Sequence, residues 1–320
     1  MLGLETEVEI ASQVDFATFN TTARQKLNVY RITGGQTRSR PQDNILNGGM
    51  NNLSDPTQPA PGLPEHRIEI EAPLCINQLG YWLRAFFGAP VTDDSGDPDF
   101  EHLFKSGVTT LPILSIQQKR QSGDFVKHLG CVGESFRIKL DPEQDGFARV
   151  MMSFIGISET PAGSAAAGTV AAAPTLDRPA ERLANILYNS VAGGQVMSGE
   201  INFKRKLKRI RSADATGLPR AIQYDGKSEL TGSLHCRYDS MTMLNDARAD
   251  TERAIVLELL KSAARGYRMT LAHGLLDEVP VGADGPDGVE IDIPLTGFQN
   301  SSDPALQILA LSAVESFATL

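Results

Sequence analysis

Short runs of alternating hydrophobic and polar residues recur along the chain. They occupy residues 111–119, 125–132, 134–140 and 147–157, and each run is bounded by Gly, Pro or Asp. Alternation with a period of two predicts strands with one buried face, and the short spacing between the runs is typical of antiparallel sheets. The chain is therefore predicted to be mainly β.

A different spacing predicts one helix in each half. Residues 77–87 follow the strand pattern at 67–74 and end at Gly88, and residues 239–248 are the second helix. The apolar stripe of the first helix consists of Leu79, Trp82, Leu83, Phe86 and Phe87. We interpret this stripe as helix packing on a core, and a subunit contact is the alternative.

The order of these elements repeats along the chain. The strand at 67–74 corresponds to 227–234, and each of the two precedes a predicted helix. The strand at 113–120 corresponds in the same order to 254–261. The series predicts two tandem copies of one small β-domain that carries a single helix.

An Asp-Gly dipeptide comes before the last strand of each copy. The two hairpin turns are predicted at Asp145, Gly146 and at Asp287, Gly288. In both copies, 21 residues separate the aromatic residue that opens a strand, Phe125 or Tyr267, from this glycine. Asp-Gly supplies the positive φ that a tight hairpin needs, so the spacing supports the repeat.

Two irregular segments set the expected domain boundaries. Residues 33–64 contain two Gly-Gly pairs and five prolines and are predicted to be a long loop. Residues 158–179 are rich in Ala, Gly and Pro and are predicted to be a linker. The full expected order is an N-terminal arm (1–24), a first domain (25–157), the linker (158–179), a second domain (180–300) and a C-terminal arm (301–320).

Composition narrows the range of functions. Of 320 residues, 41% are hydrophobic, which is enough for packed cores, and the net charge is −9. Such acidity argues against tight nucleic-acid binding, although it suits a surface past which DNA slides. Cys75, Cys131 and Cys236 form no CxxC motif and are expected to be buried thiols in a reducing cytoplasm. We expect neither a signal peptide nor a membrane span.

One stretch, residues 203–211, is strongly basic. On a strand its lysines would point one way and its arginines the other, and no aromatic stacking platform accompanies them. We therefore favour a solvated strand or a contact with an acidic neighbour over a DNA-binding patch. The candidate inter-subunit charge contacts are Lys204, Lys206, Lys208, Arg209 and Arg211.

Motifs of catalysis and metal binding are missing from the sequence. The histidines at 66, 102, 128, 235 and 273 form no HxH or HxxxH pair, and no GxSxG, GxxxxGK[ST] or GxGxxG motif occurs. We accordingly predict no catalytic residue, no cofactor and no metal ligand, and the chain is not expected to be an enzyme.

The pattern as a whole resembles the tail tube (major tail) proteins of long-tailed bacteriophages. The resemblance is carried by RIEIEAPL (67–74) with the following NQLGYWLRAFFGA and by HLFKSG (102–107). It continues with LPILSIQQKR (111–120), FVKHLGCVGESFRIKL (125–140), the closing strand that ends in FIG (154–156), and the second-half strand at 200–210. It covers roughly residues 25–300. It implies two tandem tail-tube-like domains, each a barrel-like β-sandwich flanked by a helix.

The resemblance also implies an assembly. Family members with one tube domain form hexameric rings, so a chain with two copies would close a pseudo-sixfold ring as a homotrimer. Stacked rings would conduct DNA to the host without binding it specifically, with the basic strand away from the lumen. The implied partners are the chain itself and the tape measure, terminator and distal tail proteins, in a virion made in the bacterial cytoplasm.

Two other functions stay open at this point. A tail terminator or connector would also be a β-rich ring, but a single one that does not stack. A glycan-binding β-sandwich would need an exposed aromatic platform, and the chain has one Trp. A hydrolase on a β-fold ranks last, because it needs a convergent polar pocket.

Overall fold

The computed structural model describes residues 5–42, 58–94, 100–189, 191–192, 196–213, 216–237, 241–281 and 289–317. Within these ranges the chain is mainly β, as predicted, with the two α-helices α1 (Leu79–Phe87) and α2 (Thr242–Arg248). Neither helix has the length and hydropathy to cross a membrane.

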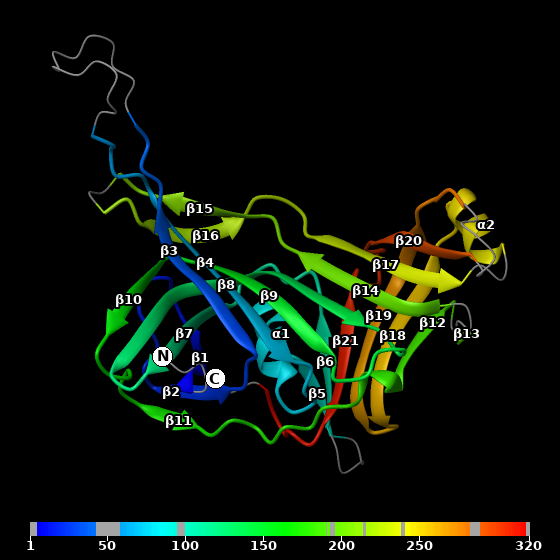
Figure 1. Cartoon of the computed structure of the whole chain (residues 1–320), viewed down its shortest axis with the longest axis horizontal. Helices are drawn as coiled ribbons and strands as arrows, with labels where there is room; N and C mark the ends of the chain where they lie inside the picture. Colours follow the sequence, from blue (N-terminus) through cyan, green and yellow to red (C-terminus); the bar gives the residue numbers. More distant parts are fainter. Residues whose placement is uncertain are drawn as a thin grey trace, which may run out of the picture.

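Both halves of the chain consist mainly of strands (Figure 1). Those of the first half are β1 (Glu7–Gln13), β2 (Ala23–Leu27), β3 (Arg31–Arg38), β4 (Pro64–Pro73), β5 (Val91–Asp93), β6 (Phe100–Lys105), β7 (Ile113–Gln121), β8 (Asp124–Leu140), β9 (Arg149–Gly156), β10 (Ser158–Ala162) and β11 (Thr169–Ala171). Those of the second half are β12 (Ala184–Tyr188), β13 (Val191–Ala192), β14 (Val196–Lys204), β15 (Leu207–Arg211), β16 (Pro219–Tyr224), β17 (Glu229–Arg237), β18 (Arg253–Ser262), β19 (Arg265–Leu276), β20 (Glu290–Gly297) and β21 (Gln307–Ser312).

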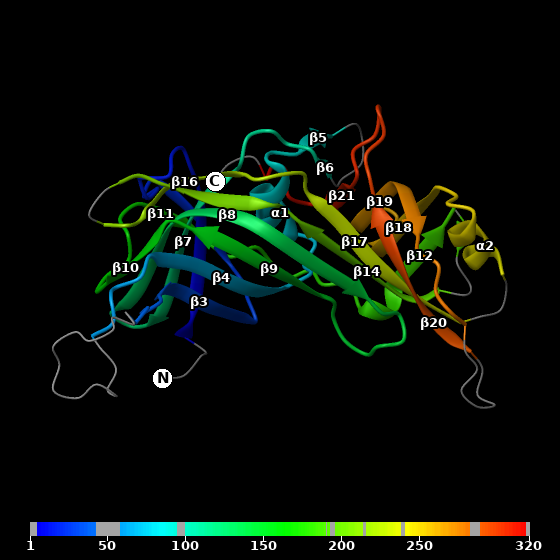
Figure 2. The same cartoon turned by 90° about the horizontal axis from the view of Figure 1, so that it is seen from above.

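An eight-stranded antiparallel sheet, here called the main sheet, runs through both halves. Its order is β3-β4-β9-β8-β14-β17-β20-β19. Figure 2 shows β4, β9, β8, β14 and β17 side by side across the molecule. The first four strands and the last four follow one connectivity, and the β8–β14 pair joins the two groups edge to edge.

Flanking strands extend each group into a curved wall. Neighbouring strands pair in the order β2-β1-β7-β8-β10 in the first half and β13-β12-β18-β19-β21 in the second half. The 17-residue β8 takes part in both walls, because its first half pairs with β7 and β10 and its second half with β9 and β14. A register shift near Gly133 accompanies this change of partners.

Helix α1 lies within the core rather than on its surface. Eight of its nine residues are buried, as expected for a helix with apolar residues on most sides. The helix ends at Gly88, which has φ 75° and donates its N–H to the carbonyl of Arg84. Gly133 of β8 allows the close approach of the helix, because a Cβ there would lie 2.6 Å from the ring of Phe86.

The segments predicted as terminal arms join the sheets. Strand β1 lies between β2 and β7, and its Val8 and Ile10 are fully buried. Strand β21 lies between β19 and β6 and so connects the second half to the first. Beyond it, Phe317 packs edge-on against Tyr81 of α1 at 5.0 Å between ring centroids. The apolar residues near both ends of the chain are therefore buried against other parts of the same chain.

Two segments predicted to be irregular contain strands. Strand β3 extends through Gly34 and Gly35 to Arg38, and β4 already begins at Pro64. Glycine with positive φ and a proline at the first residue are both tolerated in edge or terminal strand positions. The segment 158–179 likewise contains β10, paired with β8, and β11, paired in parallel with β2.

Candidate functional site at the free ends of the main sheet

One end of the main sheet is β3. Among the described residues, β3 pairs with β4 alone, and most of its residues are exposed or half-buried. The backbone N–H of Gln36 points away from β4 and donates to the Glu159 carboxylate at 2.9 Å. At Gln36 the outer edge of β3 is therefore bonded to a side chain of β10, and a further strand paired there would have to take the place of this bond.

The other end is formed by residues 277–281, which continue β19 alongside β20. The N–H of Asp277 donates to the carbonyl of Pro294 at 2.9 Å, which extends the ladder by one bond. Within the described part of the chain, no strand pairs with the far side of this segment. Pro280 lacks an N–H, and a proline at an edge weakens unspecific pairing with other strands.

At the junction between β8 and β14, an edge strand of each half pairs with the other. Phe136 lies opposite Phe203, with the two rings stacked at 5.5 Å and 29°. Ile138 lies opposite Ile201, and both are fully buried. The junction is thus a continuous part of the core and also connects the two halves of the main sheet.

The apolar stripe of α1 packs beneath this junction. Phe86 contacts Phe136 and Phe154, and Phe87 contacts Phe136 and Phe203. All members of the stripe, Leu79, Trp82, Leu83, Phe86 and Phe87, are at most 3% exposed. These side chains are buried within the chain and contact strands of both halves, so they stabilise the junction between the halves.

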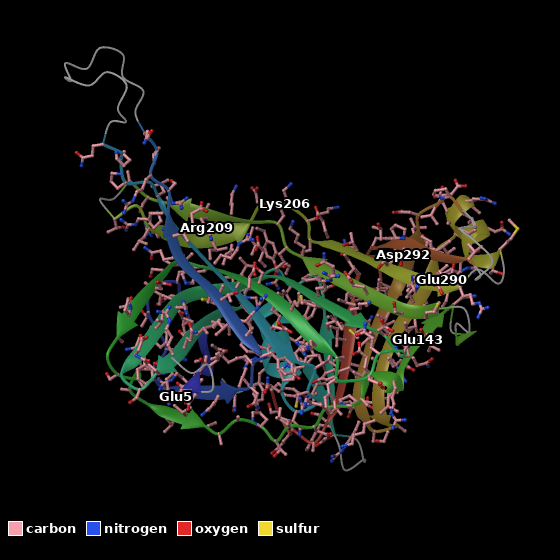
Figure 3. All side chains as sticks on the ribbon, viewed as in Figure 1. Glu5, Glu143, Lys206, Arg209, Glu290 and Asp292 are labelled. Atoms are coloured by element: carbon pink, nitrogen blue, oxygen red, sulfur yellow. The ribbon has the colours of Figure 1, made fainter. Side chains whose placement is uncertain are left out.

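The basic run does not form one strand, because β14 ends at Lys204 and β15 begins at Leu207. Lys204, Lys206 and Lys208 are exposed, and Lys208 pairs with Asp225 at 3.1 Å. Figure 3 shows Lys206 and Arg209 on the side of the β15–β16 hairpin, far from Glu290 and Asp292. The lysines therefore remain accessible to another subunit.

The arginines of the run are used within the chain. Arg209 donates to the carbonyl of His66 at 2.6 Å, and Arg211 donates to the carbonyl of Pro64 at 2.9 Å. Both bonds anchor the hairpin to the start of β4. Burial lowers the pKa of the Arg209 guanidinium, although the group still carries its charge at neutral pH.

Arg205 is a buried residue whose environment the strand pattern did not reveal. It is 1% exposed and donates to the carbonyls of Ala85 and Gly133 at 3.0 and 3.3 Å. Burial lowers its pKa. Arg205 lies in the break between β14 and β15, where its side chain is buried. The sequence could have indicated this only if it had shown that the strand ends at Lys204.

The structure describes one of the two predicted hairpin turns. Asp145 and Gly146 lie in the connection between β8 and β9, and Gly146 has φ 141°. Asp287 and Gly288 lie outside the described residues.

The exposed face of the main sheet carries paired charges. Four Arg–Glu ion pairs cross between its strands within the described residues, namely Arg31–Glu71, Arg67–Glu134, Arg149–Glu71 and Arg137–Glu200. In the second half, His235 contacts Glu290 and Asp292 (Figure 3). Acidic groups thus accompany the cations of this face and reduce their capacity to hold phosphate.

Comparison with known proteins shows a match to a protein family. The model of a family described as phage tail tube protein matches residues 3–297, which is most of the chain. A search of curated proteins finds no match.

Proposed function

This chain belongs to the phage tail tube protein family, and on that premise we propose that three copies close one ring and that stacked rings form the tube that conducts DNA. Membership makes the chain a structural component of the virion tail. The ring, its symmetry and the passage of DNA are the proposal.

A single observation carries the proposal: one order of four strands occurs twice and is joined in cis. The groups β3-β4-β9-β8 and β14-β17-β20-β19 meet through β8 and β14. A chain built of two such copies leaves the equivalents of these strands at its ends, which are β3 and residues 277–281. Joining the ends of separate chains in the same way would continue the sheet.

The ladder partners of the neighbouring strands show which residue of β3 is equivalent to which residue of β14. The last residue of β9 pairs with His66, and the last residue of β20 pairs with Leu230. On the next strands, Gln36 lies opposite His66 and Phe203 lies opposite Leu230. Gln36 therefore has the place in β3 that Phe203 has in β14.

The same comparison of ladder partners shows which residue of the segment 277–281 is equivalent to which residue of β8. Three residues before the end of β9, Ser153 pairs with Ser135. At the same place in β20, the backbone carbonyl accepts the N–H of Asp277. The residues that follow, Phe136 and Glu278, consequently have equivalent places.

In cis, Phe136 faces Phe203, so in trans Glu278 is expected opposite Gln36. Antiparallel pairing then places Thr37 opposite Asp277. Arg38 would lie diagonal to Glu278, within reach of an ion pair. Six four-stranded groups from three chains would give a closed wall without edges, as cyclic symmetry requires.

The exposed face of the main sheet is the proposed lumen wall, because the opposite face packs on α1. Its interstrand ion pairs and the net charge of −9 support a surface that does not grip DNA.

Stacking is proposed to use the β15–β16 hairpin. This hairpin connects β14 to β17, just as residues 39–63 connect β3 to β4. Its exposed Lys206 and Lys208, with Lys204 beside them, are the proposed contacts with acidic groups of the next ring. Tape measure, terminator and distal tail proteins are the further proposed partners.

Negative-stain electron microscopy of the purified chain over a concentration series tests this function. Hollow tubes whose end-on class averages show three chains in a pseudo-sixfold ring are the expected result. Single rings that never stack would favour a terminator or connector instead. A chain that stays monomeric at every concentration would contradict the proposal.

A further inference from the structure

Three strands bring two buried histidines and one carboxylate together near the start of β4. His66 comes from β4, His128 from β8 and Glu159 from β10, and Glu159 lies directly opposite His128 in the β8–β10 ladder. His66 Nε2 lies 2.9 Å from His128 Nδ1, and Glu159 Oε2 lies 4.0 Å from each of these nitrogens. Spacing along the chain gives no sign of this cluster.

From this geometry we propose that His66, His128 and Glu159 bind a transition-metal dication, with zinc as the best fit. Each residue offers one ligand atom, and the three atoms lie within 4.8 Å of one another. Ligands about 2.1 Å from a tetrahedral zinc ion lie about 3.4 Å apart, so side-chain shifts of under about 1 Å would complete the site. Water would take the remaining position.

The two imidazoles are unusual for buried polar groups. His66 is 0% exposed and His128 is 1% exposed, yet His66 Nδ1 and His128 Nε2 have no hydrogen-bond partner among the described residues. A single shared hydrogen bond leaves two buried rings poorly satisfied. An ion would replace the shared hydrogen bond by bonds to His66 Nε2, His128 Nδ1 and the carboxylate, with His66 Nδ1 and His128 Nε2 as the N–H groups of the two neutral rings.

Two glycines make the space that the cluster occupies. A Cβ on Gly156 would lie 2.4 Å from His66 Nδ1, and a Cβ on Gly35 would lie 2.6 Å from Glu159 Oε2. Two hydrogen bonds hold parts of the cluster in place. The N–H of Gln36 donates to Glu159 Oε2, and Arg209 donates to the carbonyl of His66. The first bond holds the carboxylate beside the rings, and the second holds the backbone of β4 at His66.

The electrostatic environment favours neutral rings. Burial lowers the pKa of His66 to about 4, with Arg209 as a second cause, and burial and His66 lower the pKa of His128 to about 3. Neutral imidazole is the form that binds metal. Two imidazoles and one carboxylate prefer zinc, cobalt or nickel over calcium or magnesium, which prefer oxygen ligands alone.

The test uses the full chain, stripped with a chelator that is then removed, at neutral pH. Zinc at a hundredfold excess over Kd is expected to raise Tm on the order of 5 °C, while calcium leaves it unchanged. After dialysis, elemental analysis is expected to find about one zinc per chain. Cobalt(II) in the unaltered chain is expected to give the visible absorption bands of a low-coordinate site.

Glu159→Gln keeps an acceptor for Gln36 but removes the anionic ligand, so it is expected to lose most of the zinc-dependent rise in Tm. His235→Gln is the matched control, since His235 contacts Glu290 and Asp292 through opposite ring nitrogens and cannot chelate with them. This control should retain the full rise. The proposal is overturned if the unaltered chain shows no zinc shift and no cobalt bands, or if Glu159→Gln responds to zinc as strongly as His235→Gln.

Discussion

The junction between β8 and β14 and the two free ends of the main sheet are built from different residues. At the junction, Ile138 and Ile201 are fully buried and face one another. At the free ends, β3 carries Gly34 and Gly35, and the segment 277–281 includes Pro280. The junction can therefore form as the chain folds, whereas the ends resist chance pairing.

The same order of strands can support folding at the junction and assembly at the free ends, because the residues at the two places differ. Apolar pairs stabilise an edge contact strongly but would expose aggregating surface if left unpaired. Polar, glycine-containing and proline-containing edges stabilise it less, through backbone hydrogen bonds and matched charges. We expect mutations at the junction to change the stability of the single chain, and mutations at the ends to change assembly.

The largest effect is expected from Phe203→Ala at the junction. Phe203 is 3% exposed and packs against Phe136 and Phe87. Its loss is expected to lower the free energy of unfolding by about 3–5 kcal/mol, as for other buried aromatic residues. Denaturant unfolding of the single chain measures this, with Asn202→Ala on the exposed face as the control. A change below about 1 kcal/mol would mean that the junction is not part of the core.

The next effect concerns a free end and leaves the fold unchanged. Glu278→Lys would place a like charge diagonal to Arg38 of the neighbouring chain and is expected to abolish ring closure. Single-chain stability should shift by less than about 1 kcal/mol, because the Glu278–Arg248 pair is exposed.

Adding Arg38→Glu to this variant should restore the opposite charges and, with them, assembly. Sedimentation velocity follows both variants. Normal rings from Glu278→Lys alone, or no rescue by the double change, would count against this register.

Smaller effects on stability and stacking are expected at the β15–β16 hairpin. Here the arginines bond to the chain's own backbone, whereas the lysines are exposed, so the two roles can be tested by separate variants. Arg211→Met removes the bond to the carbonyl of Pro64 and is expected to cost about 1–2 kcal/mol of unfolding free energy. Lys206→Glu, at an exposed position, should change stability by less than about 0.5 kcal/mol but weaken stacking. Tube length by electron microscopy and unfolding curves distinguish the two, and equal effects of both variants on stability would contradict the assignment.

The smallest effect is expected on the exposed sheet face. Glu71→Gln removes the carboxylate that pairs with Arg149 and Arg31, which is expected to change stability by less than about 1 kcal/mol. The released cations should slightly raise unspecific DNA binding at low salt. Fluorescence anisotropy with duplex DNA measures this, and an unchanged affinity would argue that this face does not meet DNA.

Local patterns in the sequence account for much of the fold. The alternation at 113–120 and the apolar stripe around Trp82 predict β7 and α1, because period and stop signals are local. The pairing of β21 with β6 and the packing of Phe317 on Tyr81 join distant segments. No local signal encodes such contacts, and the same holds for the meeting of His66 with Glu159.

Alternation also predicts strands better than it predicts their register. The sequence pattern equates 67–74 with 227–234, yet the ladder partners equate His66 with Leu230. The correspondence is therefore shifted by four residues. A period of two is unchanged by an even shift, so only the partner strands can fix it.

The most direct test of pairing between the free ends is a disulfide between them. Gln36→Cys combined with Glu278→Cys should cross-link neighbouring chains on oxidation, because hydrogen-bonded antiparallel pairs have Cα atoms about 5.5 Å apart. Non-reducing gels are predicted to show covalent dimers and trimers and nothing larger. Thr37→Cys with Glu278→Cys, out of register by one residue, should not cross-link. Absence of cross-links in assembled Gln36→Cys, Glu278→Cys tubes, or a ladder that continues to hexamers, would contradict the three-chain ring joined through β3.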